Sequence, residues 1–285
     1  MKVIRAESMG MCFGVRDAIA FAKRRVESGP LTVLGDLAHN ERVVGDLRSR
    51  GVRIEKDLDG PLSDTVMITA HGASEARIQR LRGRGHEVLE ATCPLVRFAH
   101  RSAARLVSAG YFPLVIGMKD HVEVRGLTED WDAFEVALTE QDIDALPFRP
   151  RYGVVAQTTQ PVARVEALVE RLRARFPESE IKWVDTVCRP TKERQSAAVS
   201  LAKAADVVVV VGGAHSNNTR QLVKTSESLG ARAHHVQSPE DVDPAWFTDG
   251  ITVGLTAGTS TPDEQIDAVE ARLKEIAASM TAAAV

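Results

Sequence analysis

Three cysteines, Cys12, Cys93 and Cys188, are the side chains best suited to chemistry, and they are spread over the 285-residue chain. An odd, small number at wide spacing does not indicate a disulfide framework. They are either buried thiols that act as small hydrophobic groups or ligands of one metal centre. Zinc sites usually use close pairs such as C-x2-C, and the chain has none. Three remote thiolates suit a [4Fe–4S] cluster with one iron open to a substrate oxygen.

Polar turn residues form a second set of candidates. His39, His71, Ser216, Asn218 and Ser260 are expected at helix N-termini, where free N–H groups and a partial positive charge bind phosphates. Helix capping is the alternative, and taken singly it explains Asn40, Ser74, Ser216 and Ser260 better. A lone histidine such as His71 is also more often structural. The phosphate hypothesis therefore depends on several of these turns meeting in one cleft.

His121 and Glu123 place an imidazole and a carboxyl group two residues apart. Beside a metal-bound hydroxyl, such a carboxyl group could relay a proton and help the oxygen leave as water. The local sequence by itself favours a plainer interpretation of Glu123, as a solvated first-turn acid that matches the helix dipole.

The elements that must position these residues alternate between short apolar strands and amphipathic helices, which indicates α/β architecture with parallel sheets. The expected strands are 31–34, 66–69, 88–90, 114–116, 153–156, 181–184, 207–211 and 252–255. The expected helices begin near residue 15 and otherwise span 41–50, 75–82, 96–108, 162–175, 191–203, 219–229 and 262–277. The Ala-rich tail, 281–285, is expected to fray.

The polar residues fall in nine strand-to-helix turns, and every third turn carries a cysteine. This predicts a threefold structural repeat, with three small parallel-sheet α/β domains in a pseudo-threefold arrangement around a central cluster. The expected domains are 1–93, 94–187 and 188–285, the last with the C-terminal helix, and residues 1–13 are candidates to pack with the third domain. Because ligands bind at the carboxyl ends of parallel strands, the nine turns can converge on one cleft.

Composition narrows the function further. The net charge is −3, from 36 basic and 39 acidic residues, which gives no overall attraction to nucleic acid. No apolar run approaches the length that spans a membrane, and the first residues lack the apolar stretch of a signal peptide. We therefore expect a cytoplasmic protein with no nucleic-acid or membrane partner. The absence of a P-loop or a convincing G-x-G-x-x-G argues against nucleotide binding.

Nine short motifs, in order along nearly the whole chain, resemble those of the 4-hydroxy-3-methylbut-2-enyl diphosphate reductases. Each motif is weak alone, but together they are highly specific. They are MCFGV (11–15), AHN (38–40), AHG (70–72), ATCP (91–94), DHVEV (120–124), AQTT (156–159), DTVC (185–188), SNNTR (216–220) and TAGTSTPD (256–263).

The resemblance implies three α/β domains around one [4Fe–4S] cluster per subunit, held by Cys12, Cys93 and Cys188. It implies reductive dehydroxylation of an allylic diphosphate to isopentenyl and dimethylallyl diphosphates, in the non-mevalonate isoprenoid pathway. The substrate hydroxyl would bind the unique iron, and a ferredoxin or flavodoxin type donor would supply electrons.

The same resemblance implies roles for individual residues. Glu123 would be the proton relay, with Thr158 near the substrate alcohol and His121 near the proton path. Asn40 and Thr191 would be supporting positions. The substrate-binding positions would be His39, His71, His121, Thr158, Ser216, Asn217, Asn218 and Ser260.

This chain departs from the family pattern at several positions. Val122 stands where the family usually has Pro, Ala214-His215 replaces Lys-Asn, Asn217 replaces Ser or Gly, and Thr259 replaces Ala. These changes bear on diphosphate affinity and rate rather than on reaction type.

Two other functions stay open. One is a different open-iron dehydratase, such as a protein similar to quinolinate synthase, which would act without an external electron supply. The other is a non-enzymatic iron–sulfur redox sensor with a degenerate pocket. The in-order histidine and serine turns argue against the first. Retention of Glu123 and Thr158 argues against the second.

Overall fold

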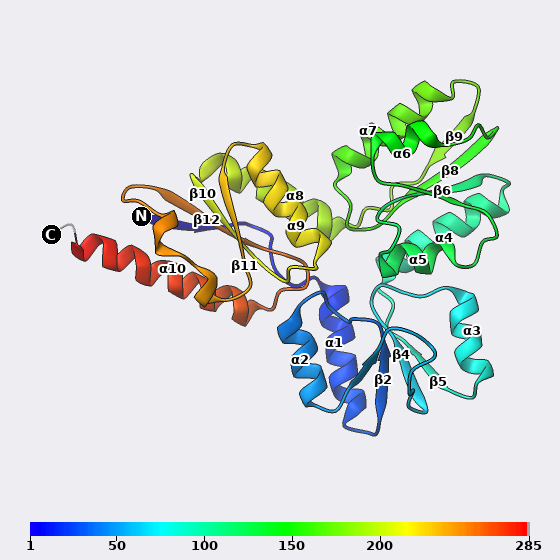
Figure 1. Ribbon diagram of the computed structural model, residues 1–285, viewed down its shortest axis with the longest axis horizontal. Helices are drawn as coiled ribbons and strands as arrows, with labels where there is room; N and C mark the ends of the chain where they lie inside the picture. Colours follow the sequence, from blue (N-terminus) through cyan, green and yellow to red (C-terminus); the bar gives the residue numbers. More distant parts are fainter. Residues whose placement is uncertain (284–285) are drawn as a thin grey trace. The chain divides into compact units, whose positions relative to one another are not determined.

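The computed structural model describes residues 1–283, which form three four-stranded sheets with helices on their faces (Figure 1). Every neighbouring pair of strands within these sheets is parallel. The prediction of an α/β protein with three small parallel sheets is confirmed.

The sheets are named here by their order along the chain. The first contains β2 (Leu31–Leu34), β3 (Arg53–Glu55), β4 (Thr65–Ile68) and β5 (Glu87–Glu90). The second contains β6 (Phe112–Ile116), β7 (Glu135–Ala137), β8 (Arg151–Ala156) and β9 (Glu180–Trp183). The third contains β10 (Val207–Val211), β11 (Arg232–Val236), β12 (Thr252–Ala257) and β1 (Lys2–Arg5).

The strand order repeats from sheet to sheet. It is β3-β2-β4-β5 in the first sheet, β7-β6-β8-β9 in the second and β11-β10-β12-β1 in the third. In each case the first strand of the set lies between the second and the third, and a fourth strand completes the far edge. The third sheet takes its fourth strand from the start of the chain, where Lys2 pairs with Thr252. The threefold repeat expected from the turns is therefore present in the topology.

Ten α-helices and two short 3₁₀ helices connect the strands in the described part of the chain. The α-helices are α1 (Phe13–Val26), α2 (Glu41–Ser49), α3 (Glu75–Gly83), α4 (Pro94–Ser108), α5 (Val122–Thr128), α6 (Glu140–Ala145), α7 (Val162–Arg175), α8 (Arg189–Ala204), α9 (Asn217–Ser228) and α10 (Asp263–Ala283). The 3₁₀ helices are η1 (Pro239–Asp241) and η2 (Pro244–Trp246). The tail that was expected to fray is helical as far as Ala283, and residues 284–285 lie outside the described residues.

The chain divides into two compact units. Unit 1 consists of residues 1–15, 38–45 and 189–285 and contains the third sheet. Unit 2 consists of residues 16–37 and 46–188 and contains the first and second sheets. The domain boundaries at 93/94 and 187/188 stay a prediction.

Both faces of the third sheet are buried. Val209, Val253 and Leu255 belong to a core with α10 residues, whereas Val208 and Val210 belong to a second core with residues of α8 and α9. Helix α10 accordingly lies on one side of the sheet and α8 with α9 on the other (Figure 1). This explains the uninterrupted valine run of β10, because a parallel strand covered on both faces has no polar side to alternate with.

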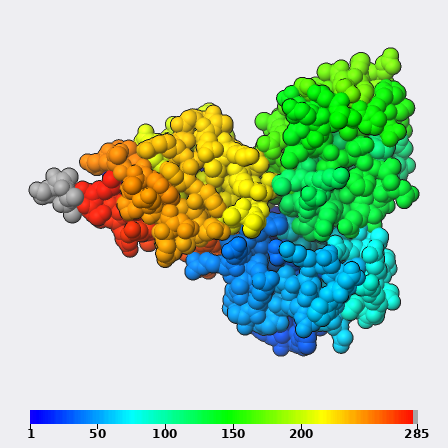
Figure 2. Space-filling model, viewed as in Figure 1, coloured from blue at the N-terminus to red at the C-terminus, as the bar shows by residue number. Residues whose placement is uncertain are grey.

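The first and second sheets of unit 2 belong to regions that contact each other, drawn in blue to cyan and in green (Figure 2). Ser74, the N-cap of α3, donates its hydroxyl proton to Glu129 at 2.9 Å. The carboxylate of Asp130 accepts the N–H groups of Glu75 and Ala76 at 2.7 and 2.8 Å. The acids that follow α5 therefore satisfy N–H groups that the start of α3 leaves open.

The strands and helices that sequence analysis missed are short, and the missed strands all lie at the edge of a sheet. The missed strands β1, β3, β7 and β11 are all edge strands of three to five residues. An edge strand is only partly buried, so it lacks the continuous apolar run that marked the central strands. The missed helices α5 and α6 are seven and six residues long, too short to show a helical period.

Among the described residues, no helix is long and apolar enough to cross a membrane.

We expect the central and edge strands of the third sheet to differ in their contribution to stability. Val209 of β10 is fully buried, and Val209→Ala should lower the free energy of unfolding by roughly 2–3 kcal/mol through lost burial and a residual cavity. Val3 of β1 is only partly buried, and Val3→Ala should lower the free energy of unfolding by less than half as much as Val209→Ala. Urea unfolding followed by Trp246 fluorescence reports on this core. Equal losses in both variants would contradict the assignment.

Candidate active site

The three cysteines occupy the same place in the three repeats. Each follows the fourth strand of its sheet and directly precedes a helix, which is α1, α4 or α8. Each cysteine also donates its backbone N–H to a carbonyl in the turn after the neighbouring third strand, at 3.0 Å in every case. The donor–acceptor pairs are Cys12 with Thr259, Cys93 with Ala70, and Cys188 with Thr158.

This position suits thiolate chemistry. All three side chains are partly buried, and each lies at the start of a helix of 14 to 16 residues. A helix N-terminus carries partial positive charge, which stabilises a negatively charged group placed there. Cys12 belongs to unit 1, and Cys93 and Cys188 belong to unit 2. Among the described residues, no three His, Cys, Asp or Glu side chains are grouped so that they could hold a metal ion.

A buried acid lies next to the turn that binds Cys188. Glu123 is 1% exposed, and its carboxyl group accepts two hydrogen bonds from Thr158, one from the N–H at 2.6 Å and one from the hydroxyl at 2.9 Å. The carbonyl of Thr158 in turn accepts the N–H of Cys188. Glu123 is therefore not the solvated first-turn acid that its local sequence favoured, because helix α5 is packed beneath the second sheet.

Burial and hydrogen bonding act on Glu123 in opposite directions. Burial disfavours the charged carboxylate and raises its pKa to about 7, and the two hydrogen bonds from Thr158 offset part of that effect. The group can therefore hold or release a proton near neutral pH, as a general acid or base must. When Glu123 is protonated, its Oε2 can donate to the Thr158 hydroxyl, which is then able to donate onward.

His121 and His71 complete the Glu123 cluster, which we define as Glu123, Thr158, His121 and His71. His121 is the N-cap of α5, and its Nδ1 accepts the N–H of Glu123 at 3.1 Å. An imidazole that accepts at Nδ1 carries its proton on Nε2 and presents a donor on the other side of the ring. The His71 ring meets that of His121 edge to face, with centroids 5.8 Å apart. Four predicted site residues from three turns are thus brought together in unit 2.

The remaining predicted substrate-binding residues form a second group in unit 1, the Asn218 cluster, which we define as His39, Ser216, Asn217, Asn218 and Ser260. Gly213 approaches the His39 turn so closely that a Cβ at this position would collide with the His39 carbonyl oxygen. The Ser260 hydroxyl lies 3.5 Å from the same oxygen. The glycine is therefore needed for three turns from distant parts of the sequence to meet.

Asn218 shows the clearest sign of a missing ligand. Its side chain is 2% exposed, and its Oδ1 accepts the N–H of Thr259 at 3.0 Å, whereas its Nδ2 has no hydrogen-bond partner among the described residues. A buried donor without an acceptor is costly unless a ligand supplies one. Ser216 caps α9 by accepting the N–H of Thr219 at 3.3 Å, so its capping role is confirmed. The start of a helix such as α9, with this amide beside it, has the donor chemistry of an anion site.

Two polar residues that sequence analysis did not single out hold these turns in place. Gln265 of α10 is 3% exposed, accepts from Asn40 Nδ2 at 2.9 Å and donates to the carbonyl of Gln237. Asn40 in turn caps α2 through Oδ1. The buried Arg194 of α8 donates to the carbonyl of Gly10 at 3.0 Å and so orients the segment before Cys12.

A signal for Gln265 was present in the sequence. It is a polar residue on the apolar face that Ile266, Val269 and Leu273 define in α10. Arg194 gives no comparable signal, because an arginine in an amphipathic helix normally lies at the surface.

Comparison with known proteins agrees with these features. The LytB protein family matches residues 3–274. A protein from Pelobacter propionicus is 38% identical over 279 residues, which cover 97% of this chain and 99% of the relative. One from Aquifex aeolicus is 35% identical over 280 residues, which cover 96% of each chain. Both are named 4-hydroxy-3-methylbut-2-enyl diphosphate reductase.

Solved structures give the same result. The E-1-hydroxy-2-methyl-but-2-enyl-4-diphosphate reductase from Plasmodium falciparum superposes with a TM-score of 0.87 at 27% identity, covering 93% of this chain and 86% of that one. A (E)-4-hydroxy-3-methyl-but-2-enyl diphosphate reductase structure gives a TM-score of 0.69 at 33% identity, covering 96% and 100%.

The three parallel α/β sheets and these matches together define the class of the protein as a reductase. The chain belongs to the LytB protein family. The prediction of a member of this reductase family is confirmed.

The raised pKa of Glu123 has a consequence for stability. In the native protein the group keeps its proton up to about pH 7, whereas in the unfolded chain it loses the proton near the ordinary glutamate pKa of 4.5. Stability contributed by the protonated form is thus complete below pH 4.5 and is lost as pH rises through 7, by roughly 3 kcal/mol in total. The Glu123→Gln variant has no carboxyl group to titrate here and should not lose this stability as pH rises. Urea unfolding of both proteins between pH 5 and pH 8 measures it. A difference between them that stays constant with pH would contradict the assignment.

Proposed function

We propose that the chain catalyses reductive dehydroxylation of 4-hydroxy-3-methylbut-2-enyl diphosphate to isopentenyl and dimethylallyl diphosphates. The observation that carries the proposal is the Glu123–Thr158 pair. The Glu123 carboxyl group has a pKa of about 7 and is hydrogen-bonded to Thr158, and the carbonyl of Thr158 accepts the N–H of Cys188. A residue that can donate a proton is therefore tied to a turn that carries a candidate iron ligand.

The donor set fits a [4Fe–4S] cluster. Cys12, Cys93 and Cys188 supply three thiolates from equivalent helix N-termini, one from each repeat, and three ligands leave one iron of a cube open. When bound, the cluster would pass electrons to the substrate and act as a Lewis acid on its hydroxyl group. This assignment also requires that the three sheets, as domains 1–93, 94–187 and 188–285, face a common centre.

The chain's own residues account for the protons. The reaction consumes two electrons and two protons for each substrate. One proton leaves with the hydroxyl group as water, and the other is added to carbon. Protonated Glu123 donates from Oε2 to Thr158 Oγ1, 2.9 Å away, and the Thr158 hydroxyl passes a proton to the departing oxygen. His121 holds the start of α5 through Nδ1 and so keeps Glu123 in register with Thr158.

The Asn218 cluster binds the diphosphate in this proposal, and His71 and His121 stay proposed substrate-binding residues of unit 2. Asn218 Nδ2, the Ser216 and Ser260 hydroxyls and the N-terminus of α9 provide donors without a strongly basic surface. Diphosphate oxygens are strong acceptors and would satisfy these groups. Asn40 supports the His39 turn through its bond to Gln265, and Thr191, which is fully buried in α8, stays a proposed supporting position.

Turnover by protein purified without oxygen tests the proposal. With reduced methyl viologen as electron source, the allylic diphosphate should cause viologen oxidation, and mass spectrometry should detect both five-carbon diphosphates. Turnover that needs no reductant would favour an open-iron dehydratase. No turnover, combined with a redox-dependent visible spectrum, would favour a sensor.

Glu123→Gln separates proton transfer from cluster binding. The variant should keep the iron content and visible spectrum of the wild type but lose at least about a hundredfold in kcat, which is within the range of general-acid contributions. Replacement of any one of the three cysteines by serine should lower the iron content itself. Full activity of Glu123→Gln would remove Glu123 from the mechanism.

Asn218→Ala tests the diphosphate site. Removal of the buried amide leaves diphosphate oxygens without a donor and should raise the KM for substrate at least about tenfold, with a smaller change in kcat. Thr225→Ala, at a half-buried position two turns further along the same helix, is the matched control and should leave KM unchanged. An unchanged KM in Asn218→Ala would place the diphosphate elsewhere.

A further inference from the structure

Helix α4 presents a positively charged outer face that the proposed chemistry does not use. Arg97, Arg101 and Arg105 are exposed and recur every four residues, so they lie along one side of the helix. Phe98, next to the first of them, is 42% exposed. Exposed aromatic and arginine side chains together are typical of protein–protein interfaces.

The positive charge of this face is not cancelled by its neighbours. Arg97 lies 3.7 Å from Glu90, which is held more closely by Arg82 at 2.9 Å. Within residues 1–283, Arg101 and Arg105 form no ion pair. Asp130 lies on the other side of the cavity beside α4, where its carboxylate accepts two N–H groups at the start of α3. The outer half of α4 therefore presents two exposed arginines without an ion pair.

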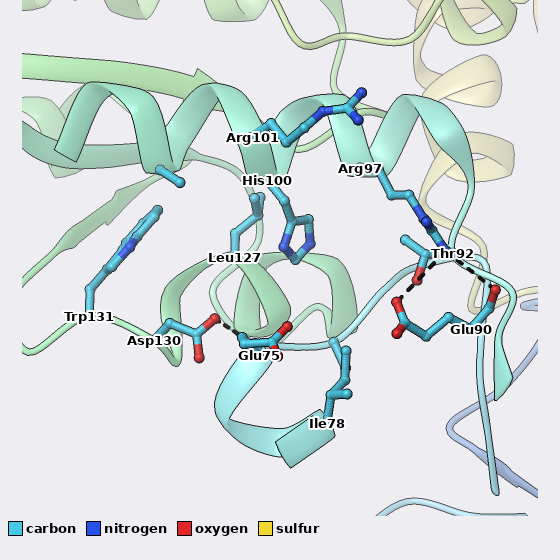
Figure 3. A pocket seen from close by; sticks show the side chains of 12 residues that line it. Glu75, Ile78, Glu90, Thr92, Arg97, His100, Arg101, Leu127, Asp130 and Trp131 are labelled. Atoms are coloured by element: carbon cyan, nitrogen blue, oxygen red, sulfur yellow. Dashed lines mark hydrogen bonds and ion pairs between the residues drawn. The ribbon is translucent and has the colours of Figure 1, made fainter. Parts of the chain in front are cut away.

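A cavity of about 430 Å³ opens alongside the same helix (Figure 3). Its lining includes Arg97, Arg101 and Ala104 of α4, and Leu127 and Trp131 lie opposite. His100 points into it from α4, whereas Arg101 lies on the side of the helix that faces away from Ile78 (Figure 3). The recess can accept an apolar side chain of a partner while the arginines stay at its rim.

Helix α4 also connects this face with a candidate iron ligand. It begins at Pro94, directly after Cys93. At a rise of about 1.5 Å per residue, Arg97, Arg101 and Arg105 lie about 6, 12 and 18 Å along the helix from that cysteine. A protein docked on this face would therefore place its own redox group close to Cys93.

We propose that the outer face of α4 is the docking surface for a small acidic one-electron carrier protein. The inference rests on the proposed function, because reductive dehydroxylation needs two electrons that the chain itself cannot supply. Each docked carrier is oxidised by one electron and leaves, so two docking events complete one turnover. Complementary charge would speed these encounters without requiring a tight complex. A stripe of three arginines on a chain of net charge −3 fits such a small partner better than a nucleic acid.

The double variant Arg101→Glu/Arg105→Glu tests this surface against a matched control. The control, Arg24→Glu/Arg80→Glu, makes the same charge change at two exposed arginines on α1 and α3. Turnover is measured with reduced methyl viologen and, separately, with an acidic ferredoxin held reduced. The α4 variant should keep viologen-driven turnover but show a KM for ferredoxin at least about tenfold higher at low salt. Added salt should shrink that difference.

The two proposals fail in different ways. Absence of viologen-driven turnover in the wild type would overturn the proposed function. Normal viologen-driven turnover with the same ferredoxin KM in both double variants would overturn the docking surface alone. The docking surface would also be overturned if the wild type bound RNA and the α4 variant lost that binding while keeping the wild-type KM for ferredoxin.

Discussion

One backbone hydrogen bond, repeated three times, is the constraint on which the candidate site depends. In each repeat the cysteine that follows the fourth strand donates its N–H to a carbonyl in the turn after the third strand. The bond joins the segment before each of the helices α1, α4 and α8 to a turn that carries polar residues. For Cys188 that turn contains Thr158, which also binds Glu123. Cys188 and the Glu123–Thr158 pair are thereby linked by backbone geometry rather than by side-chain contact alone.

Glu123 shows how the fold uses opposing effects to set the state of one group. Burial by itself would keep the carboxyl group neutral, and hydrogen bonds by themselves would keep it charged. Thr158 supplies both hydrogen bonds from one residue, which leaves the pKa at about 7 rather than far from neutrality. The Asn218 cluster makes a different compromise, since Asn218 has one satisfied atom and one buried donor that is not satisfied. The first arrangement suits proton exchange and the second suits ligand binding.

Much of the fold could be predicted because the central strands carry their own signal. The run Val207–Val211 is apolar on both faces, and the structure covers both faces. The edge strands β5 and β9 were predicted, but the edge strands β1, β3, β7 and β11 were not, because strands such as β3 and β7 gain their order from a neighbour's hydrogen bonds rather than from an apolar pattern.

The candidate site, like the fold, has features that the sequence predicts and features that it does not. The order of the cysteine, histidine and serine motifs identified the family and the candidate residues. The burial of Glu123, the role of Gln265 and the contact between Gly213 and the His39 turn are long-range properties that no local window contains. Local reasoning about Glu123 was wrong because a seven-residue helix is too short to show which side faces the core.

The pairing of β1 with β12 sets the order of assembly. Lys2 and Thr252 are partners although they lie 250 positions apart, so β1 cannot complete its sheet before β12 has been made. Cys12 follows β1 and bonds to the turn after β12, and its place in the fold therefore depends on that late pairing. The first and second sheets are continuous in sequence and can form earlier. Any centre that needed all three thiols would then have to wait for β12, whereas the turns that carry Cys93 and Cys188 could already be in position.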